Sequence, residues 1–578
     1  MSNGFGSLYV GSSGLRGAQN GLNILSNNLA NIATPGYVRR RVIYEDDVYN
    51  SFERVAVSKQ QTGMGVNIGD VIHARDFFLD QSYRKESSRA SFYTTGYDAA
   101  LEVQTQLQET NGEAFKDAIA DLYGAFAEYA KAPGDTVNQN LVIQKSELFL
   151  SRSEEVYDGL KNYQYTINTK IRNDVNRIND LGKEIAKLNK EITRIEAGKR
   201  ETAMDLRDLR DKDLDELSSL AKISVRECVS GAVKVRLEGS EFIDEVNYSE
   251  IKLKEDKVTG FLDPYWKDLS DPLNEQYYMV FNPTDADPAL NSDMGEVKSL
   301  LLARGDGIGN YTDIKYLTST DYDKGIGKSI VKNAQAELDK LVNTIVTRVN
   351  DLLCPNKNFN PNEHGGVTEG IDEDGKKVVL TADTKILDEK NTPVGGDYKL
   401  PPDELFVRSG SKRYKKITLK NGDKVYAYQD ENIHDLSTCY SLNSLNVNKD
   451  LTENPSHLPH LQQNGNIDYT LGAKINAIWE VNEYTLNPSD VSPTTLLGFY
   501  TKYIGELATT GSVYKTTSES VEGTKKAIDH SRNGVVGVSS DEELVSMVKY
   551  QNAYNASSRY INVVNEMIEY LLSSLYSK

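Results

Sequence analysis

The sequence predicts an α+β multidomain protein in which long, coiled-coil-like terminal helices and a central helical bundle carry inserted β-rich outer domains. Three observations support this fold class. Apolar residues recur every seven positions at both ends of the chain, and isoleucines do so between residues 171 and 192. Two other stretches alternate apolar and polar residues between turn-forming residues. A period of seven is typical of helices that pack along a seam, and a period of two is typical of strands.

The N-terminal heptad predicts an amphipathic helix with an apolar seam. Two positions of the repeat form this seam. The first holds Leu8, Leu15, Leu22 and Leu29, and the second, three residues further on, holds Gly11, Ala18, Leu25 and Ile32. We expect the helix to stop at Thr34-Pro35-Gly36-Tyr37, because proline disfavours helix in the preceding residue and Pro-Gly suits the centre of a type II turn.

A second apolar stripe predicts a C-terminal helix that runs nearly to the end of the chain. Ser540 is a candidate N-cap, followed by acidic residues that favour the positive end of the helix dipole. The stripe holds Met547, Tyr554, Ile561, Ile568, Val564 and Leu571. The two terminal helices could pack on each other within one domain, or they could complete their burial only against neighbouring subunits.

Helical patterns dominate residues 98–221. Ile171, Ile178, Ile185 and Ile192 define a helix from about Leu141 to Glu196, whose companion stripe is interrupted by Asp174. The stretches that could cover its seam are residues 98–131, 206–220 and 338–352, so we expect a bundle inside one subunit.

The sequence predicts two β-rich insertions, at residues 222–298 and 355–440. The first insertion includes an expected strand at residues 277–281. Both insertions lie between helices that belong together, so we expect the chain to fold back on itself with its ends innermost. We expect four units. They are residues 1–45 with 536–578 as the terminal helical assembly domain; 46–221 with 299–354 and 441–535 as the mainly helical domain; and the insertions 222–298 and 355–440.

The composition of the 578-residue chain argues against several classes of protein. A net charge of −19 disfavours binding to nucleic acid, and no apolar run is long enough to predict membrane insertion. The N-terminus lacks the pattern of a cleavable signal peptide. The three cysteines lie far apart and form no CxxC pair, so they predict neither a disulfide framework nor a zinc site.

Candidate catalytic and ligand-binding motifs are weak. The run 325–329 ends like a phosphate-binding loop, but Tyr322 stands where the first glycine is required. We expect His457 and His460 to be exposed loop residues, because Pro459 between them spoils a helical ligand face.

Residues around Asp372 miss the calcium-loop pattern, since Gly370 occupies its first ligand position. Cys354 and His364 have no third group to orient them as nucleophile and base, and Cys354 reads as a packing residue at a helix end. We therefore predict no catalytic, cofactor-binding or metal-binding residue, and no enzymatic activity.

Both ends of the chain resemble a known family. The run Leu22–Tyr37 is similar to the N-terminal signature of flagellar rod, hook and hook-associated proteins, and residues 538–544, 549–557 and 567–569 resemble the C-terminal signature. The stretch Asp205–Ser218 is similar to one in the hook-associated proteins, although its charges alone would indicate a solvated helix face. Further matches are at residues 129–133, 186–192, 445–448 and 496–500.

The resemblance implies a structural axial component of the bacterial flagellum that joins hook to filament by self-assembly. It implies export through the flagellar type III apparatus, an extracellular position at the hook–filament junction, and terminal helices that order as they assemble. The implied partners are further copies in a ring, the hook protein, the second junction protein (hook-associated protein 3) and an export chaperone at the C-terminal region. The predicted assembly interface comprises Leu8, Leu15, Leu22, Leu25, Leu29, Ile32, Thr34, Pro35, Gly36, Tyr37, Met547, Gln551, Tyr554, Ile561, Val564, Ile568 and Leu571.

Two alternatives stay open at this point. The chain could be another flagellar axial protein, of the hook or the distal rod, although the isoleucine heptads disfavour this. It could also be an axial protein that carries an enzyme in residues 355–440.

Overall fold

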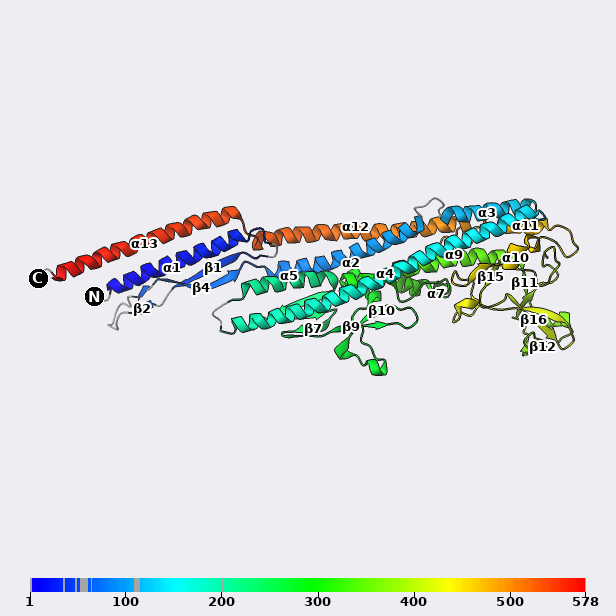
Figure 1. The fold of residues 1–578 in the computed structure, drawn as a ribbon, viewed down its shortest axis with the longest axis horizontal. Coiled ribbons are helices and arrows are strands. Elements are labelled where there is room, and N and C mark those ends of the chain that lie inside the picture. The colour runs from blue at the N-terminus through cyan, green and yellow to red at the C-terminus, as the bar shows by residue number, and fades with distance from the viewer. Residues whose placement is uncertain are drawn as a thin grey trace.

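The computed structural model is a long, narrow molecule with both termini at one end (Figure 1). It describes residues 3–34, 37–46, 49–51, 61–63, 65–108, 115–198 and 202–576. The chain leaves the terminal helices, runs to a β-rich region at the opposite end, and returns to the terminal end (Figure 1). The expected folding back of the chain is therefore present, and the α+β multidomain fold class is confirmed.

Thirteen α-helices lie within the described residues. They are α1 (Asn3–Ala30), α2 (Phe77–Gln108), α3 (Phe115–Lys131), α4 (Thr136–Glu196), α5 (Met204–Leu220), α6 (Glu296–Arg304), α7 (Thr312–Lys315), α8 (Ser319–Lys324), α9 (Ile330–Leu353), α10 (Lys449–Glu453), α11 (Tyr469–Ala477), α12 (Leu496–Val536) and α13 (Ser540–Tyr576).

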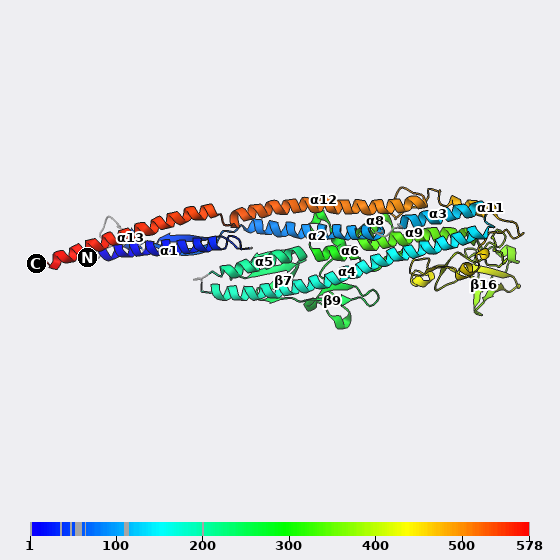
Figure 2. The same cartoon turned by 45° about the horizontal axis from the view of Figure 1, so that its top comes forward.

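Helices α2, α4, α9 and α12 form the helical body and lie along its length in both views (Figures 1 and 2). The longest, α4, has 61 residues, which is about 92 Å at 1.5 Å per residue. It begins five residues before the expected start, because the Asp135 side chain accepts a hydrogen bond from Val137 N and caps it. Ile171, Ile178 and Ile185 are fully buried, as a bundle inside one subunit requires.

The strands lie in several small sheets. They are β1 (Arg40–Asp46), β2 (Tyr49–Ser51), β3 (Gln61–Gly63), β4 (Val66–His73), β5 (Ile223–Glu227), β6 (Val233–Leu237), β7 (Ser240–Asp244), β8 (Asn247–Tyr248), β9 (Ile251–Glu255), β10 (Leu262–Trp266), β11 (Asn356–Asn358), β12 (Glu369–Asp372), β13 (Lys377–Val379), β14 (Lys385–Leu387), β15 (Phe406–Arg408), β16 (Tyr414–Leu419), β17 (Lys424–Tyr428) and β18 (Leu445–Val447).

The first insertion holds an antiparallel sheet in the order β5-β6-β7-β8 and the hairpin β9-β10. The prediction of a strand at residues 277–281 is wrong. This segment makes only one isolated bridge to β10, between Tyr265 and Met279. Pro264 in β10 accepts from Val280 N but has no N–H to return, and Pro283 follows soon after, so the ladder cannot extend.

The second insertion is built on a six-stranded sheet in the order β11-β14-β17-β16-β12-β13. Its buried side chains, among them Ile386, Ile417, Leu419 and Val425, form a small separate core. This insertion lies at the end of the molecule opposite the termini (Figure 1).

Two observations bear on the expected domain limits. The antiparallel pair β1-β4 packs on α1, so residues 66–73 lie with the terminal helices rather than with the body. Strand β15 pairs with β18 across the expected limit at residue 440, and residues 454–468 carry no α-helix. We therefore propose to extend the terminal unit to about residue 75 and the second insertion beyond residue 447.

Candidate assembly interface

Helices α1 and α13 lie side by side and run in opposite directions (Figure 1). Gly11 lies against Ile561 near one end of the pair, and Gly21 lies against Tyr550 further along. A Cβ atom would come within 2.6 Å of Ile561 if added to Gly11, and within 2.9 Å of Tyr550 if added to Gly21. Both distances are too short for real atoms, so the glycines let the two helices approach closely.

The predicted interface residues divide by burial within this pair. Leu25 and Val564 are buried. The half-buried residues are Leu8, Leu15, Leu22, Leu29, Tyr37, Met547, Tyr554, Ile561 and Ile568, and the exposed ones are Ile32, Thr34, Gln551 and Leu571. Pro35 and Gly36, which carry the expected turn, lie outside the described residues. The seam is therefore covered largely within the subunit, and its use between subunits stays a prediction.

A second set of apolar residues on α13 faces away from α1, and the sequence analysis missed it. At 100° per residue these positions lie opposite Tyr550 and Ile561 on the helix. We call this set the outer stripe. It comprises Val545, Val548, Val563, Met567 and Tyr570, which are 56%, 56%, 46%, 61% and 76% exposed.

Asn28 joins the end of α1, the segment after it and the start of α13. Its amide nitrogen donates to Glu543 at 3.0 Å and to Arg40 O at 3.1 Å. Its amide oxygen accepts from Tyr37 Oη at 2.9 Å and from Arg40 N at 3.1 Å. Arg39 Nε also donates to Glu543 at 2.7 Å. Asn28 and Glu543 are 0% and 1% exposed, and the amide uses its full hydrogen-bonding capacity. No sequence motif would have revealed this contact, which spans 515 positions.

The acidic residues of α5 do more than form a solvated face, because several of them pair with other parts of the chain. Asp205 forms an ion pair with Arg40, and Asp208 accepts a hydrogen bond from Val38 N at 3.4 Å. Burial raises the pKa of Asp208 to about 6. This end of α5 therefore holds the segment that leads out of the terminal pair.

The next two carboxylates on α5 bind arginines of α2 and α12. Arg84 donates to Asp211 at 3.1 Å and to Asp215 at 2.7 Å, and Arg532 donates to Asp215 at 2.7 Å. Arg84 and Asp211 are both 6% exposed. Since the acidic positions recur every three or four residues, they lie on one face of α5 and fasten it to the helices that lead to both termini.

The structure also places the residues of the rejected chemical motifs. Cys354 is buried, its thiol faces the carbonyl of Pro402, and burial raises its pKa. His364 instead contacts Asp423 at 3.1 Å. The expectation that His460 is exposed is wrong, because it is 7% exposed and contacts Leu458 O at 2.7 Å.

Within the described residues, one group could offer three metal-ligand atoms, namely Asp397, Asp403 and His457. Asp403 is already paired with Lys399 at 2.7 Å. No α-helix in the described ranges is both long enough and apolar enough to cross a bilayer.

Comparison with known proteins shows similarity to flagellar proteins at both ends of the chain and in its helical body. Residues 100–361 match the model of the flagellar hook-associated protein FlgK helical domain. Residues 8–37 match the flagella basal body rod protein model, and residues 535–574 match the C-terminal model of basal body rod proteins. A flagellar hook-associated protein 1 of Bacillus subtilis is 23% identical over 100% of this chain and 99% of its own length.

The chain is similar to flagellar hook-associated protein 1 along its whole length. A family member from Salmonella typhimurium is 26% identical over 37% of this chain and 38% of its own length. The flagellar hook junction protein FlgK from Burkholderia pseudomallei, a solved structure, covers 80% of this chain and 100% of its own, with 13% identity and a TM-score of 0.49.

The positions of the family-model matches bear on the alternatives of the sequence analysis. Rod-type models match only the terminal segments, whereas a hook-associated model matches the helical body, so a hook or distal-rod protein is disfavoured. Hook-associated protein 1 is a structural protein of the flagellum, at the junction between hook and filament. This chain is an axial structural component of the same kind.

Proposed function

We propose that this chain joins the flagellar hook to the filament by packing its α1/α13 pair against the pairs of neighbouring subunits. The observation that carries this mechanism is the outer stripe of α13. It presents apolar side chains on a helix that extends beyond the helical body (Figure 1). An exposed apolar surface of this kind is typical of an interaction site.

The energetics of the outer stripe favour association. Full burial of one large apolar side chain stabilises a contact by about 1.5–3 kcal/mol. Among the described residues, α13 packs principally on α1, and none of its other contacts in this part of the chain covers the opposite face to a comparable extent. Repetition of this contact around an axis would give a ring, in which each pair contributes to two interfaces.

The same surface has consequences for partners and export. We infer that the hook protein and the second junction protein, hook-associated protein 3, lie on either side of the ring along the axis. We also infer that an export chaperone covers the C-terminal region before assembly, because the outer stripe would otherwise favour aggregation. The chain would then pass through the flagellar type III apparatus and reach the hook tip.

Deletion of the gene tests the position of the protein. We expect electron microscopy to show bare hooks, and an immunoblot to show flagellin shed into the medium. Loss of hooks would instead place the protein in the rod or the hook. Intact filaments would contradict the proposed joining role, provided that no second copy of the gene is present.

Complementation with variants tests the mechanism. Val563→Asp places a charge on the outer stripe and should prevent incorporation into flagella, with the thermal transition of the purified chain unchanged. Val258→Asp is the matched control, because Val258 is 92% exposed in the first insertion and should tolerate the charge. If Val563→Asp restored filaments as well as Val258→Asp does, the outer stripe would not be the assembly surface.

A further inference from the structure

The second insertion contains a cavity of about 720 Å³ beside its six-stranded sheet. Residues 399–404 form one side of it, and residues 407–414 form another. The cavity lies outside the segments that the family models match, which end at residue 361 and resume at residue 535. Its size is in the range that holds a small organic ligand.

Arg408 lines this cavity and is only 4% exposed, yet its charge has no carboxylate partner within ion-pair distance among the described residues. Its guanidinium donates only to carbonyl oxygens, those of Gln429, Thr438 and Lys412. It also lies over the ring of Tyr440 at 4.7 Å. Its Nε has no hydrogen-bond partner in the part of the chain that the structure describes. A buried cation without a counter-charge is costly.

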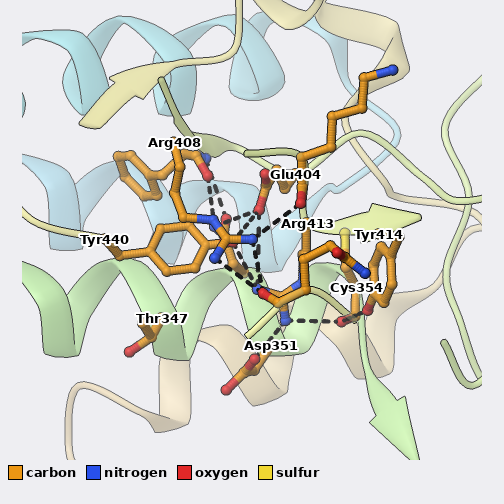
Figure 3. Close-up of polar contacts among 12 residues, drawn as sticks. Thr347, Asp351, Cys354, Glu404, Arg408, Arg413, Tyr414 and Tyr440 are labelled. Atoms are coloured by element: carbon orange, nitrogen blue, oxygen red, sulfur yellow. Dashed lines mark hydrogen bonds and ion pairs between the residues drawn. The ribbon is translucent and has the colours of Figure 1, made fainter. Parts of the chain in front are cut away.

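Arg413 lies in the same region and, unlike Arg408, has carboxylate partners for its charge (Figure 3). It is equally buried, but it forms an ion pair with Asp351 at 2.5 Å and lies 4.0 Å from Glu404. Glu404 also accepts a hydrogen bond from Tyr440 at 2.6 Å. Both of these carboxylates lie within ion-pair distance of Arg413, and neither lies within ion-pair distance of Arg408.

Two further cations line the cavity without an ion pair in the described ranges. Lys416 is half-buried and Lys412 is exposed. Of the acidic residues in the lining, Asp403 is paired with Lys399 and Glu404 with Arg413. The other two, Glu373 and Asp450, are exposed at the rim, where water screens their charge. The interior of the cavity therefore favours a negative group.

The remaining lining favours a sugar ring over a bare ion. Tyr414 and Tyr426 provide aromatic surface, and Ser409 and Ser411 provide hydroxyl groups. We propose that this cavity binds a sugar-sized ligand that carries an oxyanion, either a carboxylate or a phosphate, with the oxyanion held by Lys416 and attracted by the uncompensated charge of Arg408. A charge-assisted hydrogen bond from lysine is a strong contact for such a group.

Isothermal titration calorimetry on the full-length chain tests this site. Galacturonate and glucose 6-phosphate distinguish the two sources of the oxyanion, and galactose is the neutral control. We expect one or both anionic sugars to bind with a dissociation constant below about 1 mM, and galactose not to bind. Absence of binding by both anionic sugars would overturn the proposal, and so would equal binding of galactose.

Variants locate the binding. Lys416→Gln should weaken the binding by about tenfold or more, whereas Lys424→Gln, a change of an exposed lysine of β17 outside the cavity, should leave it unchanged. Arg408→Lys keeps the charge but changes its reach, and should also weaken binding if its thermal transition matches that of the wild type. Equal affinities in Lys416→Gln and Lys424→Gln would contradict the assignment, whatever Arg408→Lys does to folding.

Discussion

Helices α4 and α13 both carry an apolar heptad that the same chain covers, but α13 also carries the outer stripe. On α4, Ile178 and Ile185 are fully buried by other elements of the same chain. On α13, the inward seam meets α1, while Val563 and Met567 on the other side are 46% and 61% exposed. A heptad therefore predicts a helix and its inward seam, but not whether the helix has a second apolar face.

The difference lies in the number of neighbours that one subunit provides. Helix α4 packs against α3, α5, α6 and α9 as well as strands of the first insertion. Helix α13 packs principally against α1, at the narrow end of the molecule (Figure 1). The apolar seam of α4 is thus covered within one subunit, whereas the outer stripe of α13 stays exposed.

The largest expected effect is a charge in the seam of the body. Ile178→Asp would bury an ionised carboxylate without a partner, which costs about 4 kcal/mol or more. We expect the purified chain to lose its cooperative urea transition, followed by circular dichroism. Val258→Asp is the exposed control. A wild-type midpoint for Ile178→Asp would show that the α4 seam is not a subunit core.

A smaller, local loss of stability is expected from a change at Asn28, which joins α1 to the start of α13. Asn28→Ala removes four hydrogen bonds and leaves the buried carboxylate of Glu543 with Arg39 as its main partner, at a cost of about 2–3 kcal/mol. Backbone amide hydrogens of α1 and α13 should exchange faster in this variant than in the wild type, while those of α4 should not. The exposed Asn27→Ala is the control. An equal increase in α4 would mean that the pair and the body unfold as one unit.

The smallest expected effect concerns Asp174, the residue that interrupts the α4 stripe. Burial, followed by the nearby charge of Glu296, raises its pKa from 3.8 to about 6. The folded state therefore favours the protonated form, and stability is lost as the pH rises from about 4 to about 6. Asp174→Asn should be more stable than the wild type at pH 7.5, by at most about 1 kcal/mol because solvent still reaches the site.

Unfolding by urea at pH 4.5 and pH 7.5 measures this difference. The gain of Asp174→Asn should be larger at pH 7.5 than at pH 4.5, and the exposed control Asp180→Asn should show no such change. A gain that is larger at pH 4.5 would mean that the carboxylate form of Asp174 is stabilised in the folded chain.

Much of the architecture could be predicted from local patterns. The α4 helix and the strand content of the two insertions follow from periods of seven and two, which act over neighbouring residues. The segment 277–281 has strand-like residues but only Pro264 and its neighbours to pair with, so tertiary context overrode its pattern.

The candidate interface could be predicted only in part. The heptad located the seam around Leu25 and Val564, but the outer stripe was hidden because α13 is apolar on more than one face. The buried contact between Asn28 and Glu543 joins opposite ends of the chain, so no local pattern encodes it. The carboxylates of α5 look like a solvated face until their arginine partners on other helices are placed.

The most direct test of the account is site-specific photocrosslinking in assembled flagella. A photoreactive phenylalanine analogue would replace Met567 on the outer stripe or, as a control, Val258 in the first insertion. The account predicts crosslinks from position 567 to neighbouring axial subunits, and few from position 258. Incorporation of the position-567 protein with crosslinks only within its own chain would contradict the claim that the outer stripe is the assembly surface.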